Sequence, residues 1–186
     1  YYYNGTQLLM ESKSGDRIYY IYGATGIEGM MLKSLSMETV YYFDKNTLGD
    51  IIAIRDEYGN IVARYEYDAW GNCTITNDTT NYTIAHANPF RYRSYYYDTD
   101  TGFYYLQTRY YDPAIRRFIN ADGYVNATGD ILGFNMYAYC GNNPVNRKDP
   151  TGQFWITALI VTAVVAVCTV TLSGCSAQPT KPSNYV

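Results

Sequence analysis

The chain has 186 residues, a formal net charge of −3 and 24 tyrosines, so about one residue in eight is a tyrosine. A charge balance this close to neutral excludes the basic surface that binds nucleic acid, and the aromatic content excludes a disordered chain. The four cysteines are too sparse for a disulfide scaffold, and their spacings of 67, 28 and 7 residues match no zinc site. We therefore expect no nucleic-acid partner, no metal and no cofactor.

Short alternating runs of β-branched and aromatic residues dominate the first part of the chain. They cover residues 17–22, 39–44, 51–55 and 61–68, and each is bounded by glycine, asparagine or aspartate. These bounding residues permit the positive φ angles of tight turns, and the runs between them fit a pleated, half-buried surface. The pattern predicts β-hairpins.

The hairpins repeat along the chain. An aromatic residue closes successive runs at Tyr22, Phe43 and Tyr67, at intervals of 21 and 24 residues. Intervals of this size are typical of stacked repeats, in which each unit buries its face only against its neighbours. Because residues 1–5 already read as the middle of such a unit, we expect the chain to be part of a longer protein.

The composition changes near residue 153. Residues 154–172 carry no charge, and all of these 19 residues except four threonines are apolar. A helix of that length would span about 28 Å, which is close to the thickness of a bilayer core. We predict a transmembrane helix within residues 153–173, followed by a polar tail at 174–186. The alternative is a buried strand or helix of a further domain, because many of these residues are β-branched.

Several motifs resemble those of the rearrangement-hotspot (RHS) proteins. Residues 65–72, with the sequence Tyr65-Glu66-Tyr67-Asp68-Ala69-Trp70-Gly71-Asn72, resemble the YD repeat of that family. Residues 88–152 resemble its RHS repeat-associated core domain through an ordered series of motifs: Asn88-Pro89-Phe90-Arg91-Tyr92-Arg93, Tyr95-Tyr96-Tyr97-Asp98, Thr101-Gly102-Phe103-Tyr104-Tyr105-Leu106-Gln107-Thr108-Arg109-Tyr110-Tyr111-Asp112-Pro113, Arg117-Phe118-Ile119-Asn120-Ala121-Asp122, Asn135-Met136-Tyr137-Ala138-Tyr139-Cys140-Gly141-Asn142-Asn143-Pro144-Val145 and Asp149-Pro150-Thr151-Gly152.

This resemblance implies an all-β fold and a domain organisation. Stacked YD hairpins in residues 1–87 would form part of a hollow β-shell, and the core domain at 88–152 would plug the end of that shell. A variable C-terminal segment, often a toxin, would lie inside and begin just after residue 152. The implied partners are the upstream repeats of the same shell and the C-terminal segment. The protein would be secreted or at the cell surface, with membrane contact through residues 154–172.

The resemblance also implies a site, because the core domain of the family resembles an aspartic autoprotease. The matching carboxyl pair is Asp122 and Asp149, and the cleavage junction is Gly152 and Gln153. In such a pair one carboxylate activates a water molecule and the other acts as an acid toward the peptide oxygen. Asp149 begins an intact Asp-Pro-x-Gly motif, whereas Asp122 is followed by Gly123. The alternative is that both aspartates only cap turns.

The function predicted from the sequence is therefore structural. A shell and its plug would enclose and present a toxin-like segment, and self-cleavage by an aspartic protease site would be the enzymatic activity. The alternative function is a cell-surface adhesion or carbohydrate-binding module without enzymatic activity. Its partner would be a surface glycan, because exposed tyrosine rings stack well on sugars.

Overall fold

The computed structural model describes residues 1–13, 15–35, 37–80, 83–123 and 135–157 of the chain. Strands make up most of the regular structure in these ranges, and the helices there are single turns. This confirms the predicted all-β fold class.

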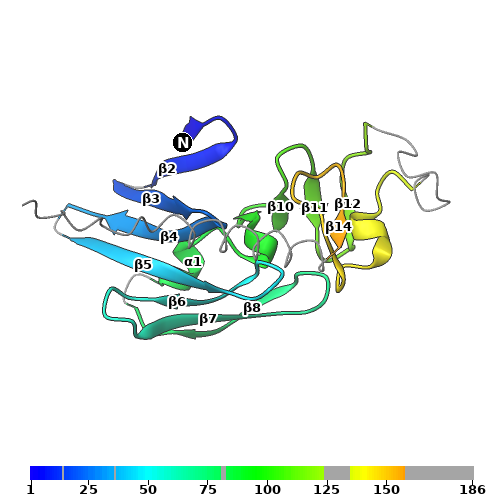
Figure 1. Ribbon diagram of the computed structural model, residues 1–186. Coiled ribbons are helices and arrows are strands. Elements are labelled where there is room, and N and C mark those ends of the chain that lie inside the picture. Colours follow the sequence, from blue (N-terminus) through cyan, green and yellow to red (C-terminus); the bar gives the residue numbers. More distant parts are fainter. Residues whose placement is uncertain (14, 36, 81–82, 124–134, 158–186) are drawn as a thin grey trace, which may run out of the picture.

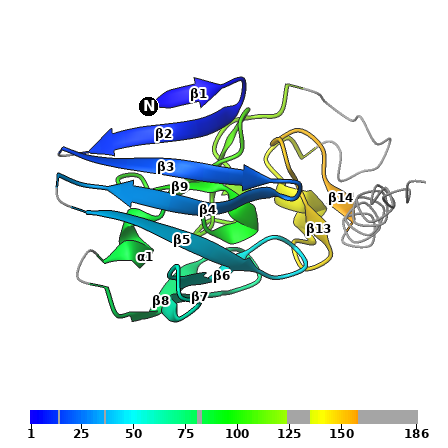
Figure 2. The same cartoon turned by 60° about the vertical axis from the view of Figure 1, so that its left-hand side comes forward.

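Eight strands form one antiparallel sheet in which each strand pairs with its neighbours along the chain. They are β1 (Tyr2–Asn4), β2 (Gln7–Lys13), β3 (Asp16–Gly23), β4 (Gly26–Lys33), β5 (Glu38–Lys45), β6 (Ile51–Arg55), β7 (Ile61–Tyr67) and β8 (Cys73–Asp78). The sheet is curved, and the short helix α1 (Ile84–Ala87) lies inside the curve (Figure 1, Figure 2). The four alternating runs of the sequence correspond to β3, β5, β6 and β7.

Side chains on the inner face of this sheet form a first apolar core. Along β5, Tyr41 and Phe43 are buried and the intervening Tyr42 is exposed, as the two-residue period of a strand requires. Ile84 and Ala85 of α1 complete this core from inside the curve. Its other buried members are Leu8, Ile18, Tyr20, Ile27, Met30, Leu32, Ile51, Ile54, Ala63, Tyr65 and Phe90. The hairpins therefore share one core, as stacked repeats do.

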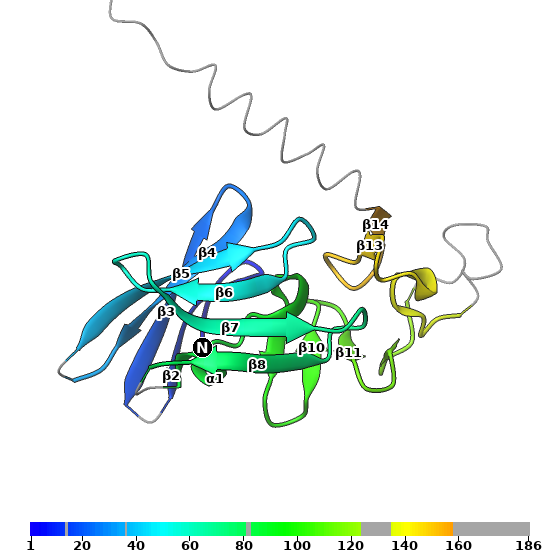
Figure 3. The same ribbon diagram turned by 90° about the horizontal axis from the view of Figure 1, so that it is seen from below.

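The remaining described elements gather toward one end of the curved sheet (Figure 1, Figure 3). They are η1 (Tyr92–Ser94), β9 (Tyr96–Asp98), β10 (Phe103–Tyr105), β11 (Tyr110–Asp112), β12 (Arg117–Phe118), η3 (Tyr139–Asn142), β13 (Arg147–Lys148) and β14 (Ile156–Thr157). Strands β9 to β12 form a second antiparallel sheet, and β13 pairs with β14. A second core, built mostly from tyrosine, comprises Tyr92, Tyr95, Tyr104, Leu106, Tyr111, Phe118, Tyr139 and Cys140.

Three tyrosines of the second core bind the turn between β7 and β8. The hydroxyls of Tyr92, Tyr104 and Tyr111 donate to the main-chain oxygens of Ala69 (2.9 Å), Gly71 (2.9 Å) and Trp70 (2.7 Å), respectively. Each ring packs in the core while its hydroxyl satisfies a carbonyl group, which a phenylalanine could not do. These bonds attach the second core to the β7–β8 hairpin.

The predicted transmembrane helix does not begin at Phe154. Ile156–Thr157 forms strand β14, which pairs with Arg147–Lys148, and the Arg147 guanidinium lies 3.6 Å from the centroid of the Trp155 ring. β-Branched residues favour this extended conformation when a partner strand is available. The part of the chain that the structure describes contains no helix long and apolar enough to cross a membrane. Residues 158–172 lie outside the described residues, and membrane insertion there stays a prediction.

Candidate functional site

Asp149 begins a tight turn and is buried, with 2% of its surface exposed. Its Oδ1 accepts hydrogen bonds from the N–H groups of Thr151 (3.3 Å), Gly152 (2.8 Å) and Gln153 (3.1 Å). The Tyr95 hydroxyl donates to the main-chain oxygen of Asp149 at 2.6 Å and accepts from its N–H at 3.2 Å. Burial raises the pKa of Asp149 above its ordinary value, and a neighbouring guanidinium and the N–H donors oppose that rise.

Arg109 connects the two aspartates that are predicted as a catalytic pair. Its Nη1 lies 3.0 Å from Oδ2 of Asp122, and its Nη2 lies 3.5 Å from Oδ2 of Asp149. The buried guanidinium also lies over the ring of Phe118, 3.6 Å from the centroid. Although 27 residues separate the aspartates in the chain, the fold brings both to one cation.

The predicted cleavage junction belongs to the same site. Arg109 Nε donates to the main-chain oxygen of Gly152, and the Thr108 hydroxyl lies 2.7 Å from the main-chain oxygen of Thr151 and 3.1 Å from that of Gly152. A Cβ atom on Gly152 would lie 2.8 Å from the main-chain oxygen of Leu106 and 2.9 Å from Thr108 Oγ1. Glycine is therefore required here, because no side-chain atom fits into this close approach. The carbonyl group that joins Gly152 to Gln153 faces both a cation and a hydroxyl.

The two carboxyl groups have different surroundings. The Asp149 side chain is 3% exposed, whereas the Asp122 side chain is 16% exposed. A carboxyl group in dry surroundings holds its proton more readily, and one that reaches water can accept a proton from it. The arrangement can thus polarise the Gly152 carbonyl, and it places the Asp149 carboxyl group beside the Gln153 nitrogen, whose hydrogen bond it accepts. It is equally able to cap the turn, because Asp149 satisfies three N–H groups.

Thr108 and Arg109 are site residues that the sequence pattern does not single out. Both lie inside one of the motifs that carry the family resemblance. A weaker signal for Arg109 is its place between the apolar Leu106 and the aromatic Tyr110-Tyr111. An arginine buried among such residues would need an acidic partner. The pattern does not indicate which of the 17 acidic residues that partner is.

A cavity of about 1150 Å³ opens beside the junction. Its wall combines residues of the first strands with residues next to the junction, among them Tyr1, Tyr3, Tyr22, Lys45, Tyr96, Tyr105, Leu106, Tyr110, Lys148 and Pro150. Lys148 immediately precedes the buried Asp149. Burial lowers the pKa of Lys148 to about 8, and the positive charge of Arg93 adds to this shift. Keeping the Lys148 amine charged at the cavity wall therefore lowers the free energy of unfolding.

Replacing Lys148 by methionine is expected to stabilise the fold in a pH-dependent way. Because the pKa of Lys148 in the folded chain is about 8, against an ordinary value of 10.5, the unfolded chain binds this proton more tightly between those pH values. The penalty is therefore full below pH 8 and fades as the pH rises toward 10.5. At pH 7 we expect the free energy of unfolding to increase by about 1–3 kcal/mol in denaturant titrations.

The matched control is Lys33→Met, because Lys33 is exposed on β4 and pairs with Glu38 at 2.8 Å. This variant should show no gain in stability at pH 7. The assignment to Lys148 of a half-buried charge that costs stability fails if Lys148→Met matches the wild type at pH 7, or if its advantage grows as the pH rises.

The other candidate groups form no second site in the described part of the chain. No three His, Cys, Asp or Glu side chains there are placed to hold a metal ion. His86 is exposed on α1, and Cys73 and Cys140 are free thiols. Cys168 and Cys175 lie outside the described residues.

Comparison with known proteins assigns the family. The protein-family model of the teneurin YD-shell matches residues 6–145, which is most of the chain. The chain belongs to the teneurin YD-shell family. This confirms the family resemblance seen in the sequence, since the matched range includes residues 65–72 and most of residues 88–152.

The relatives of this YD-shell chain include nucleases and toxins. It is similar to the tRNA nuclease WapA of Bacillus subtilis, with 39% identity over 162 residues that cover 86% of this chain and 7% of WapA. It is also similar to toxin protein Tse5 of Pseudomonas aeruginosa, with 29% identity over 119 residues that cover 64% of this chain and 8% of Tse5.

A solved structure shares the fold. The crystal structure of TcdB2-TccC3-Cdc42 matches with a TM-score of 0.64 and 25% identity, and the match covers 74% of this chain and 6% of that chain. This YD-shell chain thus spans less than a tenth of the length of each of these relatives. It corresponds to one part of the YD shell of RHS-type and Tc-type toxins.

Proposed function

We propose that this YD-shell chain closes one end of a shell, encloses the segment that follows residue 152, and releases that segment by aspartyl self-cleavage. The observation that supports release is that Arg109 contacts Asp122, Asp149 and the carbonyl oxygen of Gly152. One cation thus joins two carboxyl groups to the peptide bond that they would cut.

The proposed reaction is a hydrolysis of the bond between Gly152 and Gln153. Asp122 accepts a proton from a water molecule as the water oxygen attacks the carbonyl carbon of Gly152. Arg109 Nε stabilises the charge that develops on the carbonyl oxygen. In this proposal Asp149 carries a proton on Oδ2 and gives it to the Gln153 nitrogen, whose N–H is hydrogen-bonded to Oδ1, as the carbon–nitrogen bond breaks. The products are a carboxyl group on Gly152 and an amino terminus on Gln153.

The cavity beside the junction supports enclosure of the released segment. Pro150, two residues before the junction, and Tyr22 of β3 line the same cavity, so there is open space between the repeats and the chain that leads to the junction. The proposed partners are accordingly the upstream repeats of the shell and the C-terminal segment, in a secreted or cell-surface protein. The names of WapA and Tse5 support a toxin-like cargo. Binding of a surface glycan, the alternative, stays a prediction that would use the tyrosines of this cavity.

Replacing Asp149 by asparagine in the full-length protein is expected to abolish release of the C-terminal fragment, because an amide cannot supply the proton. Release is followed by gel electrophoresis and mass spectrometry during a chase after synthesis. The matched control is Asp112→Asn, because Asp112 also precedes a proline and caps its own turn, accepting from the Ala114 N–H at 2.8 Å. Continued release by the Asp149 variant would refute the proposed chemistry, and equal loss in both variants would assign the effect to turn capping.

A further inference from the structure

Three turns of the repeat sheet share one hydrogen-bond pattern. In one of them the aspartate and the asparagine occupy opposite positions. In the turns at residues 56–60 and 68–72 an aspartate comes first and an asparagine fifth, with a glycine in fourth position. Asp56 Oδ1 accepts from the N–H groups of Tyr58 (3.0 Å) and Asn60 (2.8 Å), and the second turn repeats this pattern. The turn at residues 46–50 instead begins with Asn46 and ends with Asp50.

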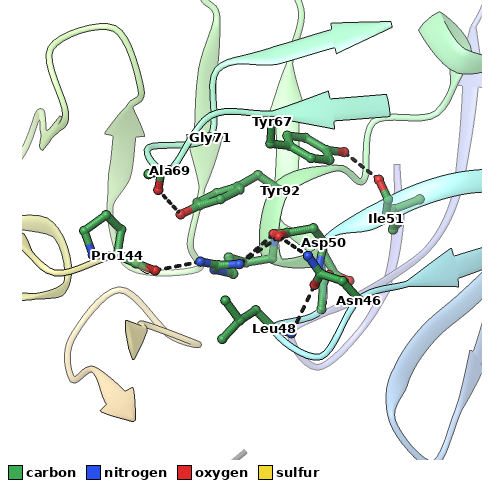
Figure 4. Close-up of polar contacts among 12 residues, drawn as sticks. Asn46, Leu48, Asp50, Ile51, Tyr67, Ala69, Gly71, Tyr92 and Pro144 are labelled. Atoms are coloured by element: carbon green, nitrogen blue, oxygen red, sulfur yellow. Dashed lines mark hydrogen bonds and ion pairs between the residues drawn. The ribbon is translucent and has the colours of Figure 1, made fainter. Parts of the chain in front are cut away.

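The exchange leaves the turn itself intact. Asn46 Oδ1 accepts from the N–H groups of Leu48 (3.0 Å) and Asp50 (2.9 Å), and Asn46 Nδ2 donates to Asp50 Oδ2 at 2.6 Å (Figure 4). These are the bonds of the other two turns with the amide and the carboxylate in opposite places. The geometry of the turn therefore does not explain the exchange. What the exchange changes is the position of the carboxylate relative to the rest of the chain.

The Asp50 carboxylate lies against the core domain, where it pairs with Arg93. Arg93 Nη1 lies 3.0 Å and 2.8 Å from the two oxygens of Asp50, and the Arg93 N–H donates to Oδ1 at 2.8 Å. Both side chains are buried, at 3% exposed for Arg93 and 7% for Asp50. Ser94 Oγ donates to the main-chain oxygen of Gly49 at 2.7 Å, so η1 contacts the turn at two adjacent residues. A buried pair of this kind depends strongly on both partners being present.

The same short helix holds the segment that carries Asp149. Arg93 Nη2 donates to the main-chain oxygen of Pro144 at 2.7 Å, five residues before Asp149 (Figure 4). Two residues after Arg93, the Tyr95 hydroxyl bonds to both the oxygen and the N–H of Asp149. The segment at residues 144–149 is thus fixed near its start by Arg93 and at its end by Tyr95. Asp50 contributes from the repeat sheet to the first of these attachments.

We propose that Asp50 and Arg93 form a docking latch that sets the cleavage site in place only when the repeat sheet is seated against the core domain. Arg93 is a positioning residue, because it acts through Pro144 and the segment that leads to Asp149. This inference rests on the proposed self-cleavage for its functional consequence. Its structural part is that the turn at residues 46–50 keeps the junction ordered. This part does not depend on cleavage and is measured by amide exchange.

The test compares Asp50→Asn with Asp56→Asn in the full-length protein. Both variants change one turn aspartate to an amide, but only Asp50 is paired with an arginine of the core domain. We expect Asp50→Asn to slow release at least tenfold and, in chains kept uncut by Asp149→Asn, to speed amide exchange at Thr151 and Gly152 at least tenfold. Asp56→Asn should match the wild type in both measurements. Exchange in β4, within the first core, should stay at the wild-type rate in both variants.

Arg93→Lys provides a second variant that keeps the buried charge if Asp50→Asn does not fold. Lysine can pair with Asp50 but cannot also reach Pro144, so exchange at Thr151 and Gly152 should again rise at least tenfold without a change in β4. A folded variant with the wild-type amide exchange rate at the junction overturns the latch. An exchange rate that rises equally at the junction and in β4 overturns it as well. Release that persists in Asp149→Asn refutes the cleavage proposal alone, and the exchange results then decide the latch.

Discussion

Replacing Arg109 by glutamine is expected to abolish release of the C-terminal fragment and to lower the free energy of unfolding by about 3–5 kcal/mol. The guanidinium contacts Asp122 and Asp149 at 3.0 Å and 3.5 Å and donates to the Gly152 carbonyl. Glutamine would leave the Asp122 carboxylate without its cation and the Gly152 carbonyl without its strongest donor. Denaturant titration measures the stability, and a chase after synthesis measures release.

Two further variants separate charge from geometry at this position. Arg109→Lys keeps a positive charge but cannot span two carboxyl groups and a carbonyl oxygen, so we expect release to fall by about 100-fold with a smaller loss of stability. Arg64→Gln, on an exposed position of β7, serves as the control and should change neither quantity. Full release by Arg109→Gln would show that the cation plays no part in cleavage.

Replacing Gly71 by alanine is expected to lower the free energy of unfolding by about 2–5 kcal/mol. Gly71 has a φ angle of +93°, and a Cβ atom there would lie 2.7 Å from the ring of Tyr92. The added methyl group would therefore strain the main chain and also push against the tyrosine that binds Ala69. Because this turn attaches the last hairpin to the second core, the damage should reach both domains.

Gly59→Ala is the matched control for this variant. Gly59 occupies the same fourth position of a like turn, with a φ angle of +86°, but a Cβ atom added there would meet no other atom within 4 Å. Its cost should be the main-chain strain alone, about 1–2 kcal/mol. Equal losses for the two variants in denaturant titrations would contradict the claim that Tyr92 packs directly on Gly71.

Local sequence patterns predict the sheet well, because its order follows the chain. The run at residues 39–44 predicts a strand of a hairpin, and the structure has β5 there, with Tyr41 and Phe43 buried and Tyr42 exposed. The glycine-containing strand β4 gives no such alternation and escapes the pattern. The end of the described chain differs for another reason. Phe154 begins an apolar run long enough for a helix, but Ile156–Thr157 finds a partner strand in Arg147–Lys148.

The site is predictable only in part. The family resemblance identifies Asp122, Asp149 and the junction, and their contacts with Arg109 are consistent with one site. No local pattern joins Arg109 to aspartates that lie 13 and 40 residues further along the chain. The latch is harder still, because Asp50 differs from its counterparts only by an exchange of positions within a turn that keeps the same bonds.

The most direct test of the proposed self-cleavage is to determine the amino terminus of the C-terminal fragment made by the full-length wild-type protein. Intact-mass spectrometry and N-terminal sequencing give this residue without any substitution in the chain. We expect a fragment that begins at Gln153, because the carbonyl of Gly152 is the one that contacts Arg109. A chain that stays uncut, or a fragment that begins at another residue, would contradict self-cleavage at this site.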